Sequence, residues 1–266
     1  MTLISTLLAL LFERILPVGS GLRFDLWMGR LWQRRGWDSN GLGLIIMLLP
    51  GMLLWALLSG MPDLYQILLS VIILGLCLGC PGYKRVYKDY LEAVSRGDEQ
   101  ACVHYSDALG VRCDGEKPIE TVGQTLIWRN YQYFAAVIVL FVIGGAPLVL
   151  IYAAVREVAR LERDKDTSMA KLILGILDWI PARITALGYL VVGHFNRAFP
   201  VWLKYLLDVA SHPRVILAEV ALAAEDSNKS AERCVNEPAC MVRLAKRNVL
   251  FFLTLIALAS LAGWVH

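Results

Sequence analysis

Long apolar runs constrain this 266-residue chain more than any other feature of its sequence. A helix needs about 20 apolar residues to cross a bilayer, and helices satisfy their own backbone hydrogen bonds in lipid. The chain is 57% hydrophobic and 18% charged, which is too apolar for an ordinary soluble domain. Five runs fit membrane spans, near residues 3–18, 41–58, 64–80, 132–155 and 249–265. We therefore predict an all-α integral membrane protein with four to five transmembrane helices, forming one polytopic domain over residues 1–266.

The charges beside these runs predict how the chain is oriented. Lys and Arg are enriched in cytoplasmic loops of membrane proteins. Basic residues follow the first and third runs, whereas the turn at 59–63 has none. We expect helical loops at 81–131 and 196–248 on the cytoplasmic side, with the turn and both termini in the periplasm. The N-terminus has no basic segment and no small-residue cleavage site, so we expect an uncleaved first span.

Local signals predict helices within the cytoplasmic loops. Apolar residues recur at helical spacing over 83–94, Gly97 can end that helix, and Asp98 can cap a second helix that runs to Gly110. Residues 225–236 are polar, and we expect them to form a loop.

A further amphipathic helix is predicted directly after residues 172–195. Its apolar face would carry Trp202, Tyr205, Leu206 and Val209, and its polar face Lys204, Asp208 and Ser211. This separation of faces is typical of a helix that lies at the membrane surface.

The strongest apolar run is interrupted by Gly144-Gly145-Ala146-Pro147. One interpretation is a kinked crossing whose small residues allow close helix packing. The other is a break that lines a cavity. A mixed-charge segment follows the run; a simple crossing would leave it in the periplasm, whereas a re-entrant hairpin turning at Gly144-Gly145 would return it to the cytoplasm. The charges favour the hairpin slightly, and both arrangements remain open.

Residues 172–195 are predicted to be membrane-embedded or interfacial, yet they contain Asp178, Pro181 and Arg183. Ionisable side chains at that depth need a partner or a polar cavity. Asp178 and Arg183 are five residues apart, so a continuous helix would not stack them. Pro181 frees a backbone carbonyl between them. We weigh an internal ion pair that anchors two segments, with Trp179 at the interface, against a ligand-binding site.

Motifs of established catalytic or metal chemistry are missing from the sequence. It has no phosphate-binding Gly-x-x-x-x-Gly-Lys-Ser/Thr loop, no His-Glu-x-x-His and no Gly-x-Ser-x-Gly. The six cysteines lack zinc-site spacing and are expected to be inert thiols. His194 lies near an expected interface, where pairing with backbone or a headgroup is the simpler role. The net charge of +3 does not indicate a nucleic-acid partner. We predict no metal and no cofactor.

Several short motifs resemble the CobD/CbiB membrane family, whose members join an aminopropanol arm to cobyric acid during cobalamin assembly. The segment 180–186, Ile-Pro-Ala-Arg-Ile-Thr-Ala, resembles that family's I-P-A-R-L-T-A signature. Gly144-Gly145-Ala146-Pro147 followed by Tyr152 is similar to its G-x-P-G-A-x-x-Y segment, and Glu120-Thr121-Val122 to its E-S-V.

Acidic motifs of those synthases are replaced in this chain. Their E-N-x-x-D falls on Gln124, Thr125 and Trp128, their N-T-L-D-S-M on the segment from Arg156 to Leu161, and their D-D pair on Leu174-Gly175. ATP-dependent ligation needs carboxylates to hold Mg²⁺ against phosphates. The resemblance therefore implies an inherited framework without the synthase reaction.

Over nearly its full length the chain resembles AmpE proteins more closely. The elements that carry this resemblance are Met1-Thr2-Leu3, Phe12-Glu13-Arg14, the segment from Leu177 to Arg183, Gly193-His194, and Ala198-Phe199-Pro200-Val201-Trp202. AmpE proteins are Gram-negative inner-membrane proteins linked to β-lactamase induction. They are usually encoded beside AmpD, a cytoplasmic amidase that recycles muropeptides.

This resemblance implies a non-catalytic inner-membrane regulatory or sensory protein associated with β-lactamase induction and cell-wall recycling. Its expected partners are the lipid bilayer and an AmpD-type amidase or another signalling protein; the sequence does not indicate an oligomeric state. The candidate ligand-binding residues are Asp178, Arg183, Trp179, Glu120, Arg156 and His194. Two alternatives remain: a membrane ligase or transferase related to adenosylcobinamide-phosphate synthase that acts on an amphipathic substrate, and a small-molecule-binding or transport protein.

Overall fold

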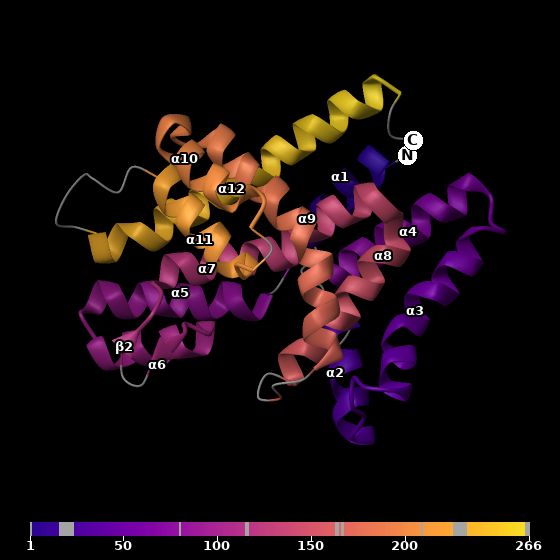
Figure 1. The fold of residues 1–266 in the computed structure, drawn as a ribbon, viewed down its shortest axis with the longest axis horizontal. Coiled ribbons are helices and arrows are strands. Elements are labelled where there is room, and N and C mark those ends of the chain that lie inside the picture. The colour runs from indigo at the N-terminus through magenta and orange to yellow at the C-terminus, as the bar shows by residue number, and fades with distance from the viewer. Residues whose placement is uncertain are drawn as a thin grey trace. The chain divides into compact units, whose positions relative to one another are not determined.

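A computed structural model describes most of the chain, and the described part is almost wholly helical (Figure 1). The described residues are 2–15, 24–79, 81–114, 117–162, 165, 168–208, 210–225 and 233–263. Four helical stretches are long and apolar enough to cross a membrane: Asp63–Arg96, Val122–Leu161, Met169–Val192 and Glu237–Leu261. A shorter apolar helix covers Gly43–Leu58. The predicted all-α integral membrane fold is confirmed.

The chain divides into two compact units, which are described separately. The first comprises Met1–Gly79, Ala136–Pro181 and Phe252–His266. The second comprises Cys80–Ala135 and Ala182–Phe251. The helix α9 (Met169–Val192) runs without interruption through Pro181, where the first unit gives way to the second, and α12 (Arg233–Leu261) also contributes to both.

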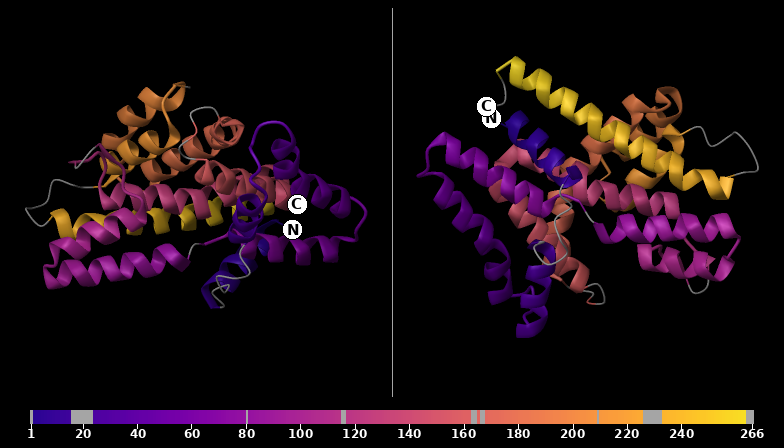
Figure 2. Two further views of the ribbon diagram at one scale, coloured as in Figure 1. Left: turned by 90° about the horizontal axis from the view of Figure 1, so that it is seen from below. Right: turned by 180° about the vertical axis from the view of Figure 1, so that it is seen from behind.

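In the first unit, α8 packs against four earlier helices. The elements of this unit besides parts of α9 and α12 are α1 (Thr2–Ile15), α2 (Phe24–Arg35), α3 (Leu42–Leu58), α4 (Asp63–Cys77) and α8 (Ala136–Leu161). Helix α8 contacts α1, α2, α3 and α4, and α1 also packs on α4. Figure 2 shows the same helices from two further directions. The predicted apolar runs at 41–58 and 64–80 correspond to α3 and α4. Three of the four helix ends lie within one residue of the predicted ends, whereas α4 ends at Cys77, three residues early.

Large residues on α2 and α3 meet small residues on α8 in the core of the first unit. Met28 and Trp32 of α2 and Met47 of α3 are buried with Ala154 and Val158 of α8. Close contact also requires Gly51 on α3, because a Cβ atom there would lie 2.2 Å from Cγ1 of Ile151. This glycine therefore sets how near α3 can approach α8.

Helix α8 is broken at Gly145, within the interruption seen in the sequence. Gly145 has φ 67° and ψ −165°, a conformation that is essentially restricted to glycine. Pro147 follows two residues later and has no backbone N–H to donate. The helical halves before and after Gly145 are thus held at an angle that a regular helix does not produce.

A hydrogen-bonded network joins the loop after α2 to the loop after α8. The buried carboxylate of Glu162 accepts hydrogen bonds from the backbone N–H of Ser39 at 2.9 Å and from the Ser168 hydroxyl at 2.7 Å. Lys165 lies 3.4 Å from Glu162 and 3.3 Å from Asp38. Burial alone would raise the pKa of Glu162, but the hydrogen bonds from Ser39 and Ser168 and the charge of Lys165 lower it overall.

The second unit is built from shorter helices. Its elements besides parts of α9 and α12 are α5 (Pro81–Arg96), α6 (Glu99–Leu109), β1 (Cys113–Asp114), β2 (Lys117–Pro118), α7 (Val122–Asn130), the π-helix η1 (Tyr131–Ala135), α10 (Phe195–Leu206) and α11 (Pro213–Ala224). The two short strands pair antiparallel, with Cys113 opposite Pro118. Helix α5 packs on α6, α10 on α11, and α7 on both α6 and α11.

The predicted helix pair at 83–110 is confirmed at both of its predicted caps. Asp98 accepts a hydrogen bond from the backbone N–H of Ala101 at 3.0 Å, which begins α6. Gly110 ends that helix in the left-handed conformation, at φ 86°. Gly97, at φ 69°, separates the two helices.

Two predicted boundaries in the second unit are wrong. Helix α10 ends at Leu206, because Asp208 accepts the backbone N–H groups of Ala210 and Ser211 and thereby forms a turn; Ser211 is outside the helix, and Val209 lies outside the described residues. Helix α12 begins at Arg233, so residues 233–236 are helical and not loop.

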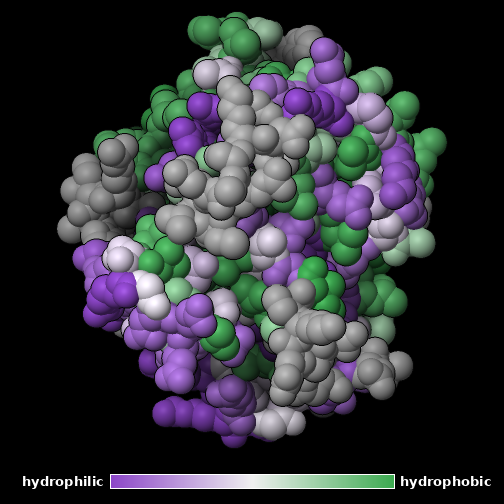
Figure 3. Space-filling model, turned by 90° about the vertical axis from the view of Figure 1, so that its left-hand side faces the viewer, coloured by the Kyte–Doolittle hydropathy of each residue, from purple (hydrophilic) through white to green (hydrophobic). Residues whose placement is uncertain are grey.

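Large apolar side chains are exposed along α3 and α4, as expected for helices that face lipid. They include Met52 at 64%, Trp55 at 68% and Leu64 at 68% exposure. The side of the molecule drawn in Figure 3 is different, because hydrophilic residues are spread among the hydrophobic ones there.

Candidate functional site

In the first unit, two predicted site residues meet at one tyrosine. Asp178 of α9 is 2% exposed and accepts a hydrogen bond from the Tyr152 hydroxyl at 3.0 Å. The guanidinium carbon of Arg156, which is also buried, lies 5.6 Å from the centre of the Tyr152 ring. The structure therefore brings Asp178 and Arg156 to opposite parts of the same side chain.

Local helix geometry explains this arrangement. Tyr152 and Arg156 are four residues apart on α8 and so share one face of it. Buried ionised groups are tolerated when they are hydrogen-bonded or paired, and this set joins α8 to α9. Tyr152 was not among the predicted site residues. Its position one turn before a cation inside an apolar run is the signal that could have identified it. Trp179, next to Asp178, is 36% exposed.

Arg183 binds the end of α10 in the second unit. Its guanidinium donates to the backbone carbonyl of Leu206 at 2.9 Å and to that of Asp208. The indole N–H of Trp202 donates back to the Arg183 carbonyl at 3.4 Å. A cation at a helix C-terminus satisfies free carbonyls and complements the helix dipole. Arg183 therefore fixes α10 to α9, and its predicted part in ligand binding stays a prediction.

Glu120, another predicted residue, is the centre of a buried ionic cluster in the second unit. It is 7% exposed and accepts a hydrogen bond from Nε of Arg214 at 3.0 Å. A terminal nitrogen of the same guanidinium forms an ion pair with the other carboxylate oxygen. The Thr125 hydroxyl donates to Glu120 at 2.9 Å, and Nε of Arg112 lies 3.4 Å away. Arg214 also donates to the carbonyl of Gly110 at 2.9 Å. One carboxylate thus joins three segments of the chain.

The cluster contains more positive than negative charge. Burial lowers the pKa of Arg214 to about 10, with Glu120 opposing this effect and the neighbouring Arg112 and Arg129 adding to it. Burial also lowers the pKa of His212, together with the charges of Arg112 and Arg214. At neutral pH Arg214 remains charged and His212 is mainly neutral. Sequence reasoning missed Arg214, which is 94 residues from its partner.

His194 stands at the start of α10 and is exposed. Its backbone N–H donates to the carbonyl of Ala224 at 2.8 Å. It lines a hollow of about 290 Å³ with Gly193, Phe195, Asn196 and Arg197. This bond is made by the backbone of His194, and the pairing predicted for its imidazole stays a prediction.

A larger cavity, of about 550 Å³, lies at the break in α8 within the first unit. Gly145, Ala146 and Pro147 line it, and Phe141 precedes them by one turn. The other lining residues are Ser5 of α1, Leu58 of α3, and Asp63, Gln66, Ile67 and Ser70 of α4. The Gly-Gly-Ala-Pro segment therefore both kinks α8 and lines a cavity, so it has features of both interpretations.

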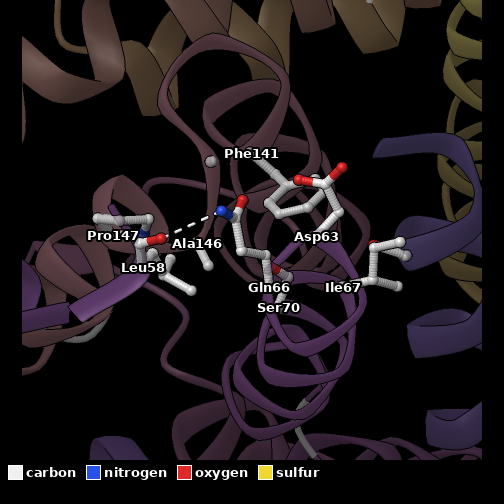
Figure 4. Close-up of a pocket in the computed structure, with 10 residues that line it drawn as sticks. Leu58, Asp63, Gln66, Ile67, Ser70, Phe141, Ala146 and Pro147 are labelled. Atoms are coloured by element: carbon white, nitrogen blue, oxygen red, sulfur yellow. Dashed lines mark hydrogen bonds between the residues drawn. The ribbon is translucent and has the colours of Figure 1, made fainter. Parts of the chain in front are cut away.

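Polar side chains from α4 enter this cavity (Figure 4). The amide nitrogen of Gln66 donates to the carbonyls of Leu58 at 3.1 Å and Met61 at 2.9 Å. Asp63, Gln66 and Ser70 were not among the predicted site residues. They recur at helical spacing along an otherwise apolar helix, and this one-sided polar stripe is the signal that could have identified them. Among the described residues, no three His, Cys, Asp or Glu side chains gather closely enough to hold a metal ion.

Four membrane-length apolar helices, with buried ionic sets in each unit and a polar cavity at a helix break, define a polytopic membrane protein. The chain belongs to the AmpE family: it matches the family described as "Regulatory signalling modulator protein AmpE" over residues 1–265. It is 27% identical to "Protein AmpE" of Shigella flexneri over 282 residues, which cover 99% of each chain. No solved structure matches it. The chain is thus a membrane protein of a regulatory signalling family.

Proposed function

We propose that this protein is a non-catalytic inner-membrane regulator or sensor that acts in β-lactamase induction and cell-wall recycling. The observation that carries the proposal is the match to a regulatory signalling family along the whole chain. An AmpD-type amidase, or another cytoplasmic signalling protein, is its proposed partner. We further propose that the large loops face the cytoplasm and both termini face the periplasm.

The contacts of the predicted site residues support a non-catalytic role. Asp178 is held by the Tyr152 hydroxyl, Arg183 by carbonyls at the end of α10, and Glu120 by Arg214. Catalytic groups need free access to a reacting atom. Side chains that join helices to one another are suited to holding or transmitting a conformation instead.

The test combines a cellular and a biochemical measurement. In the native host, deletion of the gene is expected to change β-lactamase induction by a β-lactam, and the wild-type gene is expected to restore it. Unchanged induction in the deletion strain would contradict the regulatory role. Purified protein is expected to show no turnover with ATP, Mg²⁺ and cobyric-acid or muropeptide fractions. Turnover that is lost in Asp178→Asn would establish the ligase alternative instead.

One observation favours the small-molecule-binding alternative as a second candidate, namely the cavity at Gly145. Binding and regulation are compatible, because a sensor needs a site for its signal. The chemistry of that cavity indicates what class of ligand it takes.

A further inference from the structure

We propose that the cavity at the break in α8 binds an organic ammonium group, carried either by a free amine or by a lipid headgroup. This inference concerns binding by the first unit alone and does not depend on the proposed regulatory role.

The cavity has the size and construction of a ligand site. Small-molecule sites usually measure about 300–1,000 Å³ and combine an apolar lining with a few placed polar groups. This cavity measures about 550 Å³, and its apolar lining includes Phe141, Ile67 and Leu58. Its polar side chains are Ser5, Asp63, Gln66 and Ser70. Residues from α1, α3, α4 and α8 line it, so its shape is fixed by the packing of the first unit.

The charges that line the cavity are of one sign. Asp63 is the single ionisable side chain among the ten lining residues, and none of them is Lys, Arg or His. The Gly145 break places the carbonyl end of the preceding half-helix at the cavity, and Pro147 cannot donate to the carbonyl of Ile143. The carbonyl end of a helix carries partial negative charge. The amino ends of α4 and of the second half of α8 also lie at the cavity and carry the opposite partial charge, so the preference for a cation rests on the carboxylate of Asp63.

The remaining groups select an organic ammonium over a bare metal ion. Phe141 supplies an aromatic ring, and aromatic faces attract alkylammonium groups. Gln66 directs its N–H groups to the carbonyls of Leu58 and Met61, which leaves its carbonyl oxygen as an acceptor. An ammonium donates up to three hydrogen bonds, and Asp63 and Gln66, which are three residues apart on α4, are suitable acceptors for it. Ser70 lines the cavity one turn further along the same helix. A metal ion instead requires a close shell of oxygen ligands at about 2.0–2.6 Å.

Ethanolamine and phosphatidylethanolamine both carry an ammonium group. The first is a free amine and the second a lipid, so comparing them distinguishes the two possible sources of the ligand. Full-length protein in nanodiscs of phosphatidylglycerol alone would be titrated with ethanolamine by calorimetry. In parallel, nanodiscs that contain both lipids would be analysed by native mass spectrometry for retained phosphatidylethanolamine. The test variant is Asp63→Asn, with Asp63→Glu as the conservative variant. Asp107→Asn, which changes an exposed carboxylate on α6, is the matched control.

Wild-type protein is expected to bind one of the two amines saturably. Asp63→Asn is expected to weaken this binding at least about tenfold, because a charged hydrogen-bond acceptor is lost, whereas Asp63→Glu and Asp107→Asn are expected to retain it. Saturable binding of ethanolamine would assign a free amine, and selective retention of the lipid would assign a headgroup. Equal binding by wild-type protein and Asp63→Asn, or no binding of either amine, would overturn the proposal. These readouts are independent of β-lactamase induction, so the two proposals fail separately.

Discussion

Arg214 neutralises a carboxylate that the second unit has removed from water. Glu120 is 7% exposed, and Arg214 contacts both of its oxygens. Removing one partner of a buried ion pair leaves an uncompensated charge, which typically costs about 3–5 kcal/mol. Arg112 lies near the same carboxylate and offsets part of that loss.

We therefore expect Arg214→Ala to lower the free energy of unfolding by about 3 kcal/mol, the lower end of that range. Denaturant unfolding in detergent micelles would measure the change. Lys88→Ala is the matched control, because its ion pair with Glu92 is exposed, and it should stay within about 0.5 kcal/mol of wild type. An equally small effect of Arg214→Ala would show that Glu120 does not depend on this partner.

At the scale of single residues, the sequence predicted charges better than it predicted their partners. Asp178 was found because ionisable residues are rare in apolar segments. Arg214 was missed because its partner lies 94 positions away, and no local pattern reports a contact across such a distance. Tyr152 has a local signal, its position one turn before Arg156, but that signal does not name its partner Asp178, which lies 26 positions away.

At the scale of single elements, the break in α8 predicts how a substitution at Gly145 changes the stability of the protein. Gly145 adopts a backbone conformation that is open to glycine and strained for other residues. Gly145→Ala should destabilise the protein by about 1–3 kcal/mol, since a Cβ atom is not compatible with this conformation. Thermal unfolding in micelles would show a lower midpoint.

Gly175→Ala is the matched control for this change. Gly175 lies inside α9, and a Cβ atom there meets nothing within 4 Å. This substitution should be neutral or stabilise by up to about 1 kcal/mol, because alanine favours helices. If Gly145→Ala and Gly175→Ala have the same unfolding midpoint, the glycine-specific break in α8 is contradicted.

Elements with explicit end signals were predicted best. Gly97, Asp98 and Gly110 act through their own backbone conformation or a neighbouring N–H group, so their effect can be read locally. The start of α12 was missed because its first residues are polar, and hydrophobicity marks where a helix meets lipid, not where it begins. The end of α10 was missed because the turn formed by Asp208 depends on side-chain hydrogen bonds.

For the whole molecule, the proposed orientation can be tested with two serine-to-cysteine changes. Ser59, between α3 and α4, and Ser95, on α5, are both exposed. In a cysteine-free background, a membrane-impermeant maleimide added to the periplasmic side should label Ser59→Cys in intact cells. It should label Ser95→Cys only after the inner membrane is disrupted, because positively flanked loops remain in the cytoplasm. The opposite pattern would invert the proposed topology.

The path of the fourth apolar run through the membrane could not be predicted, and its helix length explains why. The stretch Val122–Leu161 has 40 residues, which corresponds to about 60 Å of helix. The hydrocarbon core is about 30 Å thick, so hydropathy alone is compatible with either a crossing or a hairpin. The hairpin remains our proposal, and the position of Gly145 within this stretch suits a turn.

The link between Ser39 and Glu162 also has a consequence in time. These residues are 123 positions apart, and at about 5–20 residues per second the ribosome makes Glu162 roughly 6–25 seconds after Ser39. From the completion of α3 at Leu58 until the end of that interval, α2 and α3 have been synthesised while α8, against which they pack, is incomplete. During biogenesis their inner faces must be covered by lipid or by the insertion machinery until α8 is delivered.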